Sequence, residues 1–363
     1  MSPAGAAQGS QQPAVPAFLP WQVETARAWL AQRDRFAHAW LLHGMAGIGK
    51  IDFAVAAAAS LLCESSAQGL ACGACPACLW FARGNHPDLR RLRPEAVALQ
   101  EGAEQGEGEE APAEGTAAAA KRAPSREIRI DQVRALESWF NTGTHRGGWR
   151  VALVYPAQSL NVVSANALLK VLEEPPAHTI FLLVADAPDQ LLPTLVSRCR
   201  RLPLPAPTAA QASQWLAGQG LDDPQAWLAA AGGAPLAAVR LAQQRESACP
   251  DWLQGLWQQL AQGQAPDLGP LVEGLEKVPA GQWLDVLQRA YADLMLHAAG
   301  AAPRYFPQLG ASAARIAARA RPAQVAETAR WLAQQQRLAG HPLNAKLFVH
   351  ASLQRVVLSC LKG

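Results

Sequence analysis

The sequence predicts an α/β module with a parallel sheet and flanking helices, followed by two wholly helical domains. Apolar runs at 38–43, 150–154 and 179–185 are bounded by polar, glycine or proline residues, as buried strands are. Helical patterns surround these runs, and beyond Pro250 the pattern is helical throughout, with breaks near prolines and glycines. The 363 residues exceed one ordinary core, so two or three domains are expected.

The first apolar run leads directly into a glycine-rich loop and an alanine-rich helix. The loop contains Gly44, Gly47, Gly49 and Lys50. This is the context of a phosphate-binding loop, whose backbone N–H groups cradle phosphates while the lysine neutralises their charge. Ile51 replaces the Ser or Thr that would hold Mg²⁺ after the lysine. The pattern fits a degenerate phosphate loop and also a glycine turn that only packs helix against strand.

Four cysteines follow that helix at a spacing typical of metal sites. Cys72, Cys75 and Cys78 place three thiols within seven residues, and Cys63 at the end of the preceding helix supplies a fourth. Four thiolates complete a tetrahedral Zn²⁺ shell and leave no open position for catalysis, so we expect a structural zinc module over 63–78. An iron–sulfur site, a redox pair or free buried thiols are the alternatives.

Composition marks two segments that we expect to be disordered. Residues 1–17 are small, polar and proline-containing, and residues from about 93 to 125 are rich in glutamate, glycine and alanine. The N-terminus lacks the pattern of a secretion signal, and no apolar run reaches membrane-spanning length. We therefore expect a cytoplasmic protein without a membrane partner. A net charge of +3 is too small to indicate autonomous nucleic-acid binding.

Prolines within 201–207 indicate a domain boundary. We expect the α/β module to occupy 18–205, a small helical domain to occupy 206–245, and a larger helical domain to occupy 246–363. A helical bundle without a catalytic constellation is suited to oligomerisation.

The stretch from Asn166 to Cys199 is the most specific part of the sequence. A short helix ends at Pro175-Pro176, a buried strand follows at 179–185, and Ser197-Arg198-Cys199 comes soon after it. This order of helix, double carboxylate, double proline, strand and Ser-Arg-Cys resembles the clamp-loader subunits of the AAA+ ATPases, and within them the bacterial delta-prime family.

That resemblance implies a fold and a set of roles. It implies an AAA+ module with an inserted zinc module, a helical lid domain and a helical collar that assembles a five-subunit ring. Arg198 would be an arginine finger acting in trans on a neighbouring ATP site, with Ser197 and Cys199 supporting the motif. The implied partners are gamma/tau and delta subunits, the sliding clamp and, through the complex, primed DNA. The complex belongs to a DNA-directed DNA polymerase holoenzyme.

The residues for ATP hydrolysis in an active member of that family are replaced here. Besides Ile51, Tyr155 and Pro156 stand where a pair of carboxylates would hold Mg²⁺, Ala185 stands where a sensor of the γ-phosphate would be, and Pro235 lies near the place of a second-sensor arginine. We expect no independent ATPase activity and consider ATP binding doubtful.

Two other functions stay open. The chain could be an active motor ATPase of the gamma/tau type, since Lys50 is retained. It could also be a zinc-dependent nucleic-acid binder acting alone, although no basic or aromatic cluster surrounds Cys72 to Cys78.

Overall fold

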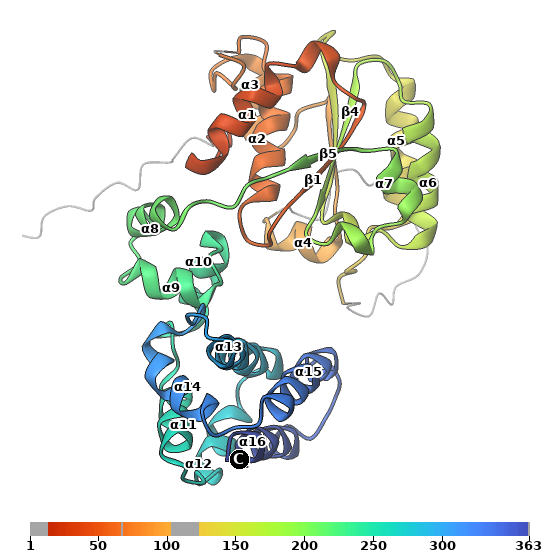
Figure 1. Cartoon of the computed structure of the whole chain (residues 1–363). Helices are drawn as coiled ribbons and strands as arrows, with labels where there is room; N and C mark the ends of the chain where they lie inside the picture. Colours follow the sequence, from red (N-terminus) through yellow and green to blue (C-terminus); the bar gives the residue numbers. More distant parts are fainter. Residues whose placement is uncertain (1–13, 67, 103–122, 362–363) are drawn as a thin grey trace, which may run out of the picture. The chain divides into compact units, whose positions relative to one another are not determined.

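The computed structural model describes residues 14–66, 68–102 and 123–361, and the chain divides after Ala206 into two compact units. The first unit is a parallel five-stranded sheet, in the order β2-β3-β4-β1-β5, with helices on both faces (Figure 1). Its strands are β1 (Ala39–His43), β2 (Leu89–Leu92), β3 (Arg150–Val154), β4 (Thr179–Ala185) and β5 (Arg200–Pro203). Its helices are α1 (Val23–Leu30), α2 (Lys50–Leu62), α3 (Pro76–Ala82), α4 (Glu95–Gln100), α5 (Ile130–Asn141), α6 (Val162–Glu173) and α7 (Pro193–Ser197).

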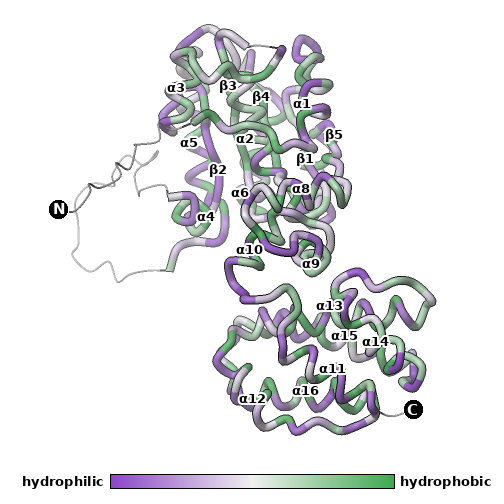
Figure 2. Tube along the Cα trace, turned by 90° about the vertical axis from the view of Figure 1, so that its left-hand side faces the viewer, coloured by the Kyte–Doolittle hydropathy of each residue, from purple (hydrophilic) through white to green (hydrophobic). Residues whose placement is uncertain are grey.

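The central strands are buried on both faces, which confirms their identification from continuous apolar runs. Successive side chains point to opposite faces. Leu42, Leu153 and Leu182 therefore pack with α1 and α2, while Leu41 and Leu183 pack with α5 and α6. Figure 2 shows the resulting hydrophobic colour along β3 and β4. The buried sheet therefore positions the loops that follow the ends of its strands.

Because the strands are parallel, their ends define two functionally distinct edges. The glycine loop follows β1, Tyr155 follows β3 and Asp186 follows β4, all at the carboxyl edge. At the opposite edge α6 ends at Glu173 shortly before β4, and α7 ends shortly before β5. The fold therefore separates the loop from the Ser-Arg-Cys segment.

The structure describes both ends of the acidic segment that the composition predicts to be disordered, residues 93–102 and 123–125. Residues 95–100 form α4, and the backbone of the two flanks is joined by a hydrogen bond of 3.0 Å from Ala96 N to Ser125 O. The Glu95 carboxylate also accepts a hydrogen bond of 2.9 Å from Ser125 N. Residues 103–122, and 1–13 of the N-terminal segment, lie outside the described residues.

The second unit is helical, as its sequence pattern predicts. Its long helix α13 packs against α14 and α15 around the buried side chains of Trp257, Trp283 and Leu287. The buried Asp293 carboxylate accepts hydrogen bonds from the backbone N–H groups of residues 304–306 and so fixes the turn that follows α13. The helices of this second unit are α8 (Ala209–Gly218), α9 (Pro224–Ala230), α10 (Pro235–Gln244), α11 (Asp251–Gln262), α12 (Gly269–Leu275), α13 (Ala280–Ala298), α14 (Gly310–Ala317), α15 (Pro322–Leu338) and α16 (Ala345–Leu361).

Within the described part of the chain, no helix combines the length and the apolar character that a membrane span needs.

Candidate functional site

The glycine loop connects β1 to α2, as the sequence predicts. Gly47 and Gly49 have φ angles of +78° and +87°, a left-handed region that favours glycine. A Cβ atom on Gly49 would also lie 2.3 Å from a methyl carbon of Leu19. Trp21 Nε1 donates a hydrogen bond of 3.0 Å to Ile48 O, and Gln22 Nε2 donates one of 2.7 Å to Gly49 O. The segment before α1 thus packs directly on the loop and holds its shape.

The Lys50 ammonium is fully engaged within the chain. Its side chain is only 3% exposed, and Nζ donates to the carbonyl oxygens of Gly44 at 2.9 Å and Met45 at 2.7 Å. Nζ also forms an ion pair with an Asp186 carboxylate oxygen at 2.5 Å. An ammonium has three N–H donors, so a phosphate oxygen reaching Lys50 would have to displace one of these partners. The Asp186 carboxylate, half exposed at the loop, is the group that a phosphate would replace.

The role of Asp186 was not predicted from the sequence. The available signal was its position immediately after β4, the strand that pairs with β1 and so ends at the same edge as the glycine loop.

Tyr155 fills the place at the end of β3 where a metal-binding carboxylate was expected in an active enzyme. Its hydroxyl accepts a hydrogen bond of 2.9 Å from Arg93 and donates one of 3.0 Å to Glu101, and these two charged groups pair at 3.1 Å. Burial, and then the nearby Glu101 carboxylate, raise the pKa of Tyr155 to about 12. The tyrosine is therefore neutral at physiological pH and offers no charge to a metal ion. Ala185 is the buried last residue of β4, and Pro235 is the first residue of α10.

We expect Tyr155→Phe to lower the free energy of unfolding by about 1–2 kcal/mol, because a buried hydroxyl that both accepts and donates a hydrogen bond is lost. Urea denaturation measures this. Tyr305→Phe is the matched control, since the Tyr305 ring lies beside the guanidinium groups of Arg289 and Arg304, contacts that phenylalanine retains; equal losses in the two variants would contradict the assignment.

The same comparison has a pH dependence with a definite sign. The folded protein retains the Tyr155 proton up to a pKa of about 12, above the value of 10 for the free side chain. The stability that this proton provides is therefore present below pH 10 and is lost as pH rises from 10 to 12. The difference between the wild-type protein and Tyr155→Phe should shrink over that interval.

Arg198 directly follows α7 as its C-terminal cap and is partly exposed. Its Nη1 donates a hydrogen bond of 3.0 Å to Thr194 O, and its Nη2 pairs with a Glu173 carboxylate oxygen at 2.5 Å. The Ser197 hydroxyl donates to the same Thr194 carbonyl at 3.0 Å and so closes the turn. Burial raises the pKa of the Cys199 thiol to about 12, so it packs as a neutral side chain between α7 and β5. Sequence reasoning missed the contact with Glu173.

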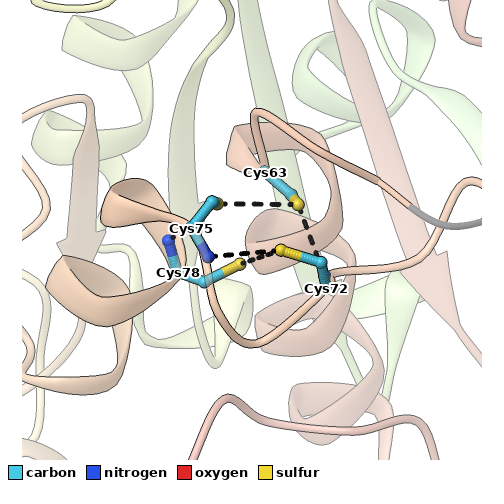
Figure 3. Close-up of side chains that lie close together, drawn as sticks. All are labelled: Cys63, Cys72, Cys75 and Cys78. Carbon is cyan, nitrogen blue, oxygen red and sulfur yellow. Dashed lines mark hydrogen bonds between the residues drawn. The ribbon is translucent and has the colours of Figure 1, made fainter.

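The four cysteines lie together at the end of α2 and the start of α3 (Figure 3). Their sulfur atoms all lie within 4.8 Å of one another, with 3.9 Å between Cys63 and Cys75 and 4.0 Å between Cys72 and Cys78. Sulfur atoms bound to one tetrahedral Zn²⁺ at about 2.3 Å are about 3.8 Å apart. The four thiols therefore fit a zinc ion, and the spacing prediction that they converge is confirmed.

Backbone geometry favours a thiolate in this cluster. The N–H groups of Ala74 and Cys75 point at the Cys72 sulfur, from 3.5 and 3.3 Å, and lower the pKa of Cys72 to about 6. Burial raises the pKa values of Cys63 and Cys78. Metal binding requires the deprotonated form. Cys72 is thus the thiolate available at neutral pH before a metal ion brings the others to that state.

Comparison with known proteins points to one family. A family model described as "DNA polymerase III, delta subunit" matches residues 24–208. DNA polymerase III subunit delta-prime of Pseudomonas aeruginosa is 40% identical over 228 residues, which cover 62% of this chain and 61% of that protein. The delta-prime subunit of Yersinia pestis is 33% identical over 281 residues, covering 74% and 75%. DNA polymerase III subunit tau of Salmonella typhimurium is 31% identical over 172 residues, covering 47% of this chain and 22% of that protein.

The family match coincides with the part of the chain that holds all three sites. Residues 24–208 include the glycine loop, the cysteine cluster and Arg198. In the Pseudomonas protein the match spans about three fifths of the length, and in the Yersinia protein it spans three quarters. On this extent and identity, the chain belongs to the family of DNA polymerase III delta-prime subunits.

Proposed function

We propose that this protein is a clamp-loader subunit whose own AAA+ site is catalytically inert and whose Arg198 acts in trans on the ATP bound by a neighbouring subunit. The observation that carries the proposal is an asymmetry within one module. Lys50 is engaged by Asp186 and two carbonyls, while Arg198 presents a partly exposed guanidinium at the other edge of the sheet.

The surroundings of the glycine loop support the proposed inertness. Phosphoryl transfer needs Mg²⁺ bridging the phosphates and carboxylate or hydroxyl oxygens to hold that ion. Ile51 has no such oxygen, and the Tyr155 hydroxyl is neutral and already bonded to Arg93 and Glu101. Any triphosphate must also displace Asp186 from Lys50. These features support a site that neither binds nor hydrolyses ATP.

The register of β1 and β5 supports action in trans. Arg200 pairs with Trp40 near the start of β1, while the glycine loop follows the other end of that strand. A five-residue strand is about 16 Å long, farther than a side chain reaches. Arg198 therefore cannot serve the loop of its own module. A guanidinium on a neighbour's γ-phosphate stabilises the charge that develops as the phosphoryl group is transferred.

The rest of the chain fits the same assembly. Cys63, Cys72, Cys75 and Cys78 would hold a structural Zn²⁺, which supplies folding energy rather than chemistry. Helices α8–α10 correspond to a lid and α11–α16 to a collar that joins the ring. The proposed partners are gamma/tau and delta subunits, with the sliding clamp and primed DNA met through the complex, in the cytoplasm. Membership in the DNA polymerase holoenzyme is part of this proposal.

The isolated protein should release no phosphate from ATP with Mg²⁺ above the rate of a buffer blank. The same preparation should co-purify with gamma/tau and delta subunits as one complex on size-exclusion chromatography. A protein that does not assemble with these subunits would contradict the proposed clamp-loader role. Steady phosphate release by the wild-type protein that disappears in Lys50→Ala would contradict the proposed inertness.

An active motor ATPase is the second candidate, and the match to a tau subunit together with the retained Lys50 favours it. The two candidates differ in one result, because only the motor has a turnover that depends on Lys50. The engagement of Lys50 by Asp186 and by the carbonyl oxygens of Gly44 and Met45 counts against the motor.

A further inference from the structure

We infer that Glu173 is a positioning residue for Arg198, an inference that rests on the proposed function. Glu173 is the last residue of α6 and lies 25 positions before Arg198 in the chain. The fold brings them together at the edge of the sheet where β4 and β5 begin, and their side chains pair at 2.5 Å.

The guanidinium is held at two points that belong to different elements. Nη1 is bonded to the carbonyl of Thr194, one turn earlier in α7, and Nη2 to the carboxylate on α6. A guanidinium has five N–H donors, so three are left for a phosphate. The contact with Thr194 alone would let the plane of the guanidinium turn about that bond. The contact with Glu173 fixes the plane and therefore the direction of the free donors.

The location of Glu173 indicates a role beyond the stability of its own helix. The C-terminal end of a helix carries partial negative charge, so a carboxylate in the last turn is unfavourable there. Pro175 and Pro176 end the helix immediately afterwards and so fix the point from which the carboxylate extends. Glu174, one residue further, is also exposed and forms no ion pair with a described residue. Of the two adjacent carboxylates, only Glu173 orients Arg198.

A held side chain matters for rate because catalysis by a charged group depends steeply on its placement. A free arginine must lose rotamer freedom when it meets the phosphate, whereas a side chain that is already held has lost much of it beforehand. The ion pair is exposed on both sides, at 35% and 52%, so it is weak enough for the remaining donors to engage a second anion. Glu173 should therefore raise the turnover that depends on Arg198 without changing how the neighbouring subunit binds ATP.

The test uses the full chain in a complex reconstituted with gamma/tau and delta subunits. ATP turnover stimulated by primed DNA and clamp is measured for Glu173→Ala, Glu173→Gln and Arg198→Ala, with Glu174→Ala as the matched control. The rate that survives in Arg198→Ala is subtracted as the contribution of the other sites. Size-exclusion chromatography verifies that each complex assembles.

We expect Glu173→Ala to lower the Arg198-dependent kcat by about two- to tenfold, with KM for ATP unchanged. Glu173→Gln keeps a hydrogen-bond acceptor and should fall between Glu173→Ala and the wild-type protein, while Glu174→Ala should match the wild-type protein. The inference is overturned if kcat is unchanged in Glu173→Ala. It is also overturned if kcat increases, because Glu173 would then inhibit the action of Arg198. If Arg198→Ala itself has no effect, the proposed function fails. If Arg198→Ala is impaired but Glu173→Ala is not, only the positioning role fails.

Discussion

Replacing Cys78 by serine is expected to abolish zinc binding and to unfold the segment between the end of α2 and the start of α3. Four thiolates around one Zn²⁺ contribute on the order of 10 kcal/mol of folding free energy at neutral pH. The other contacts of this segment are few: its local core consists of Cys75, Ala77 and Cys78 with a few half-buried neighbours, and Leu70 and Ala71 pack partly buried against the main core. Losing one ligand should therefore release the whole segment.

Metal analysis and hydrogen exchange check this prediction. The wild-type protein should carry one zinc per chain, and Cys78→Ser none, with fast exchange of the amides in 63–78. A strong chelator should produce the same change in the wild-type protein. Cys249→Ser is the control, since Cys249 is equally buried but lies in the second unit, away from the cluster. If the protein instead carries iron and absorbs visible light, the site holds an iron–sulfur cluster and not zinc. A wild-type protein without bound metal would refute the metal site.

Arg198→Ala is expected to lower hydrolysis at the adjoining ATP site of the complex by about a thousandfold or more, since a trans arginine contributes roughly 10³–10⁵ in rate in other nucleoside triphosphatases. ATP turnover of the whole complex should fall by the fraction that this site contributes. Loading of the clamp on primed DNA should fall as well. The fold should be unaffected, because Arg198 is partly exposed and its ion pair with Glu173, which is open to solvent, contributes little to stability.

Two further variants sharpen this result. Arg198→Lys keeps the charge but lacks the planar fork of donors, so it should restore only part of the rate. Arg134→Ala removes an exposed arginine from α5 and should leave turnover unchanged. A complex that assembles with Arg198→Ala and hydrolyses ATP at the wild-type rate would refute the trans role.

The elements of the first unit could be predicted because each has a local cause. Strands buried on both faces are continuous apolar runs, and β4 occupies the predicted residues 179–185. The cysteine cluster was predictable for the same reason, since a spacing of two residues lets neighbouring thiols reach one point. The helix at 95–100 was missed because its glutamate and alanine were assigned to the acidic segment, although these residues are strong helix formers.

The contacts that decide function could not be predicted in this way, because they join residues distant in the chain. Tyr155 meets Arg93 from 62 positions away, and Lys50 meets Asp186 across two paired strands. Such pairs depend on the order and direction of strands in the sheet, which no local pattern specifies. The sequence indicated which side chains replace the hydrolytic residues, but it did not indicate that Asp186 pairs with Lys50 or that Tyr155 bonds to Arg93 and Glu101.

The ion pair between Lys50 and Asp186 has a consequence for how the protein responds to metabolism. A ligand shifts the shape of a protein only through a difference in its affinity for two states. In the proposed clamp loader, the ion pair of Lys50 with Asp186 leaves this subunit little difference in affinity to offer to ATP or ADP. Its conformation should then stay constant as the balance of ATP and ADP changes, and the subunits that hydrolyse ATP would have a fixed surface against which to move.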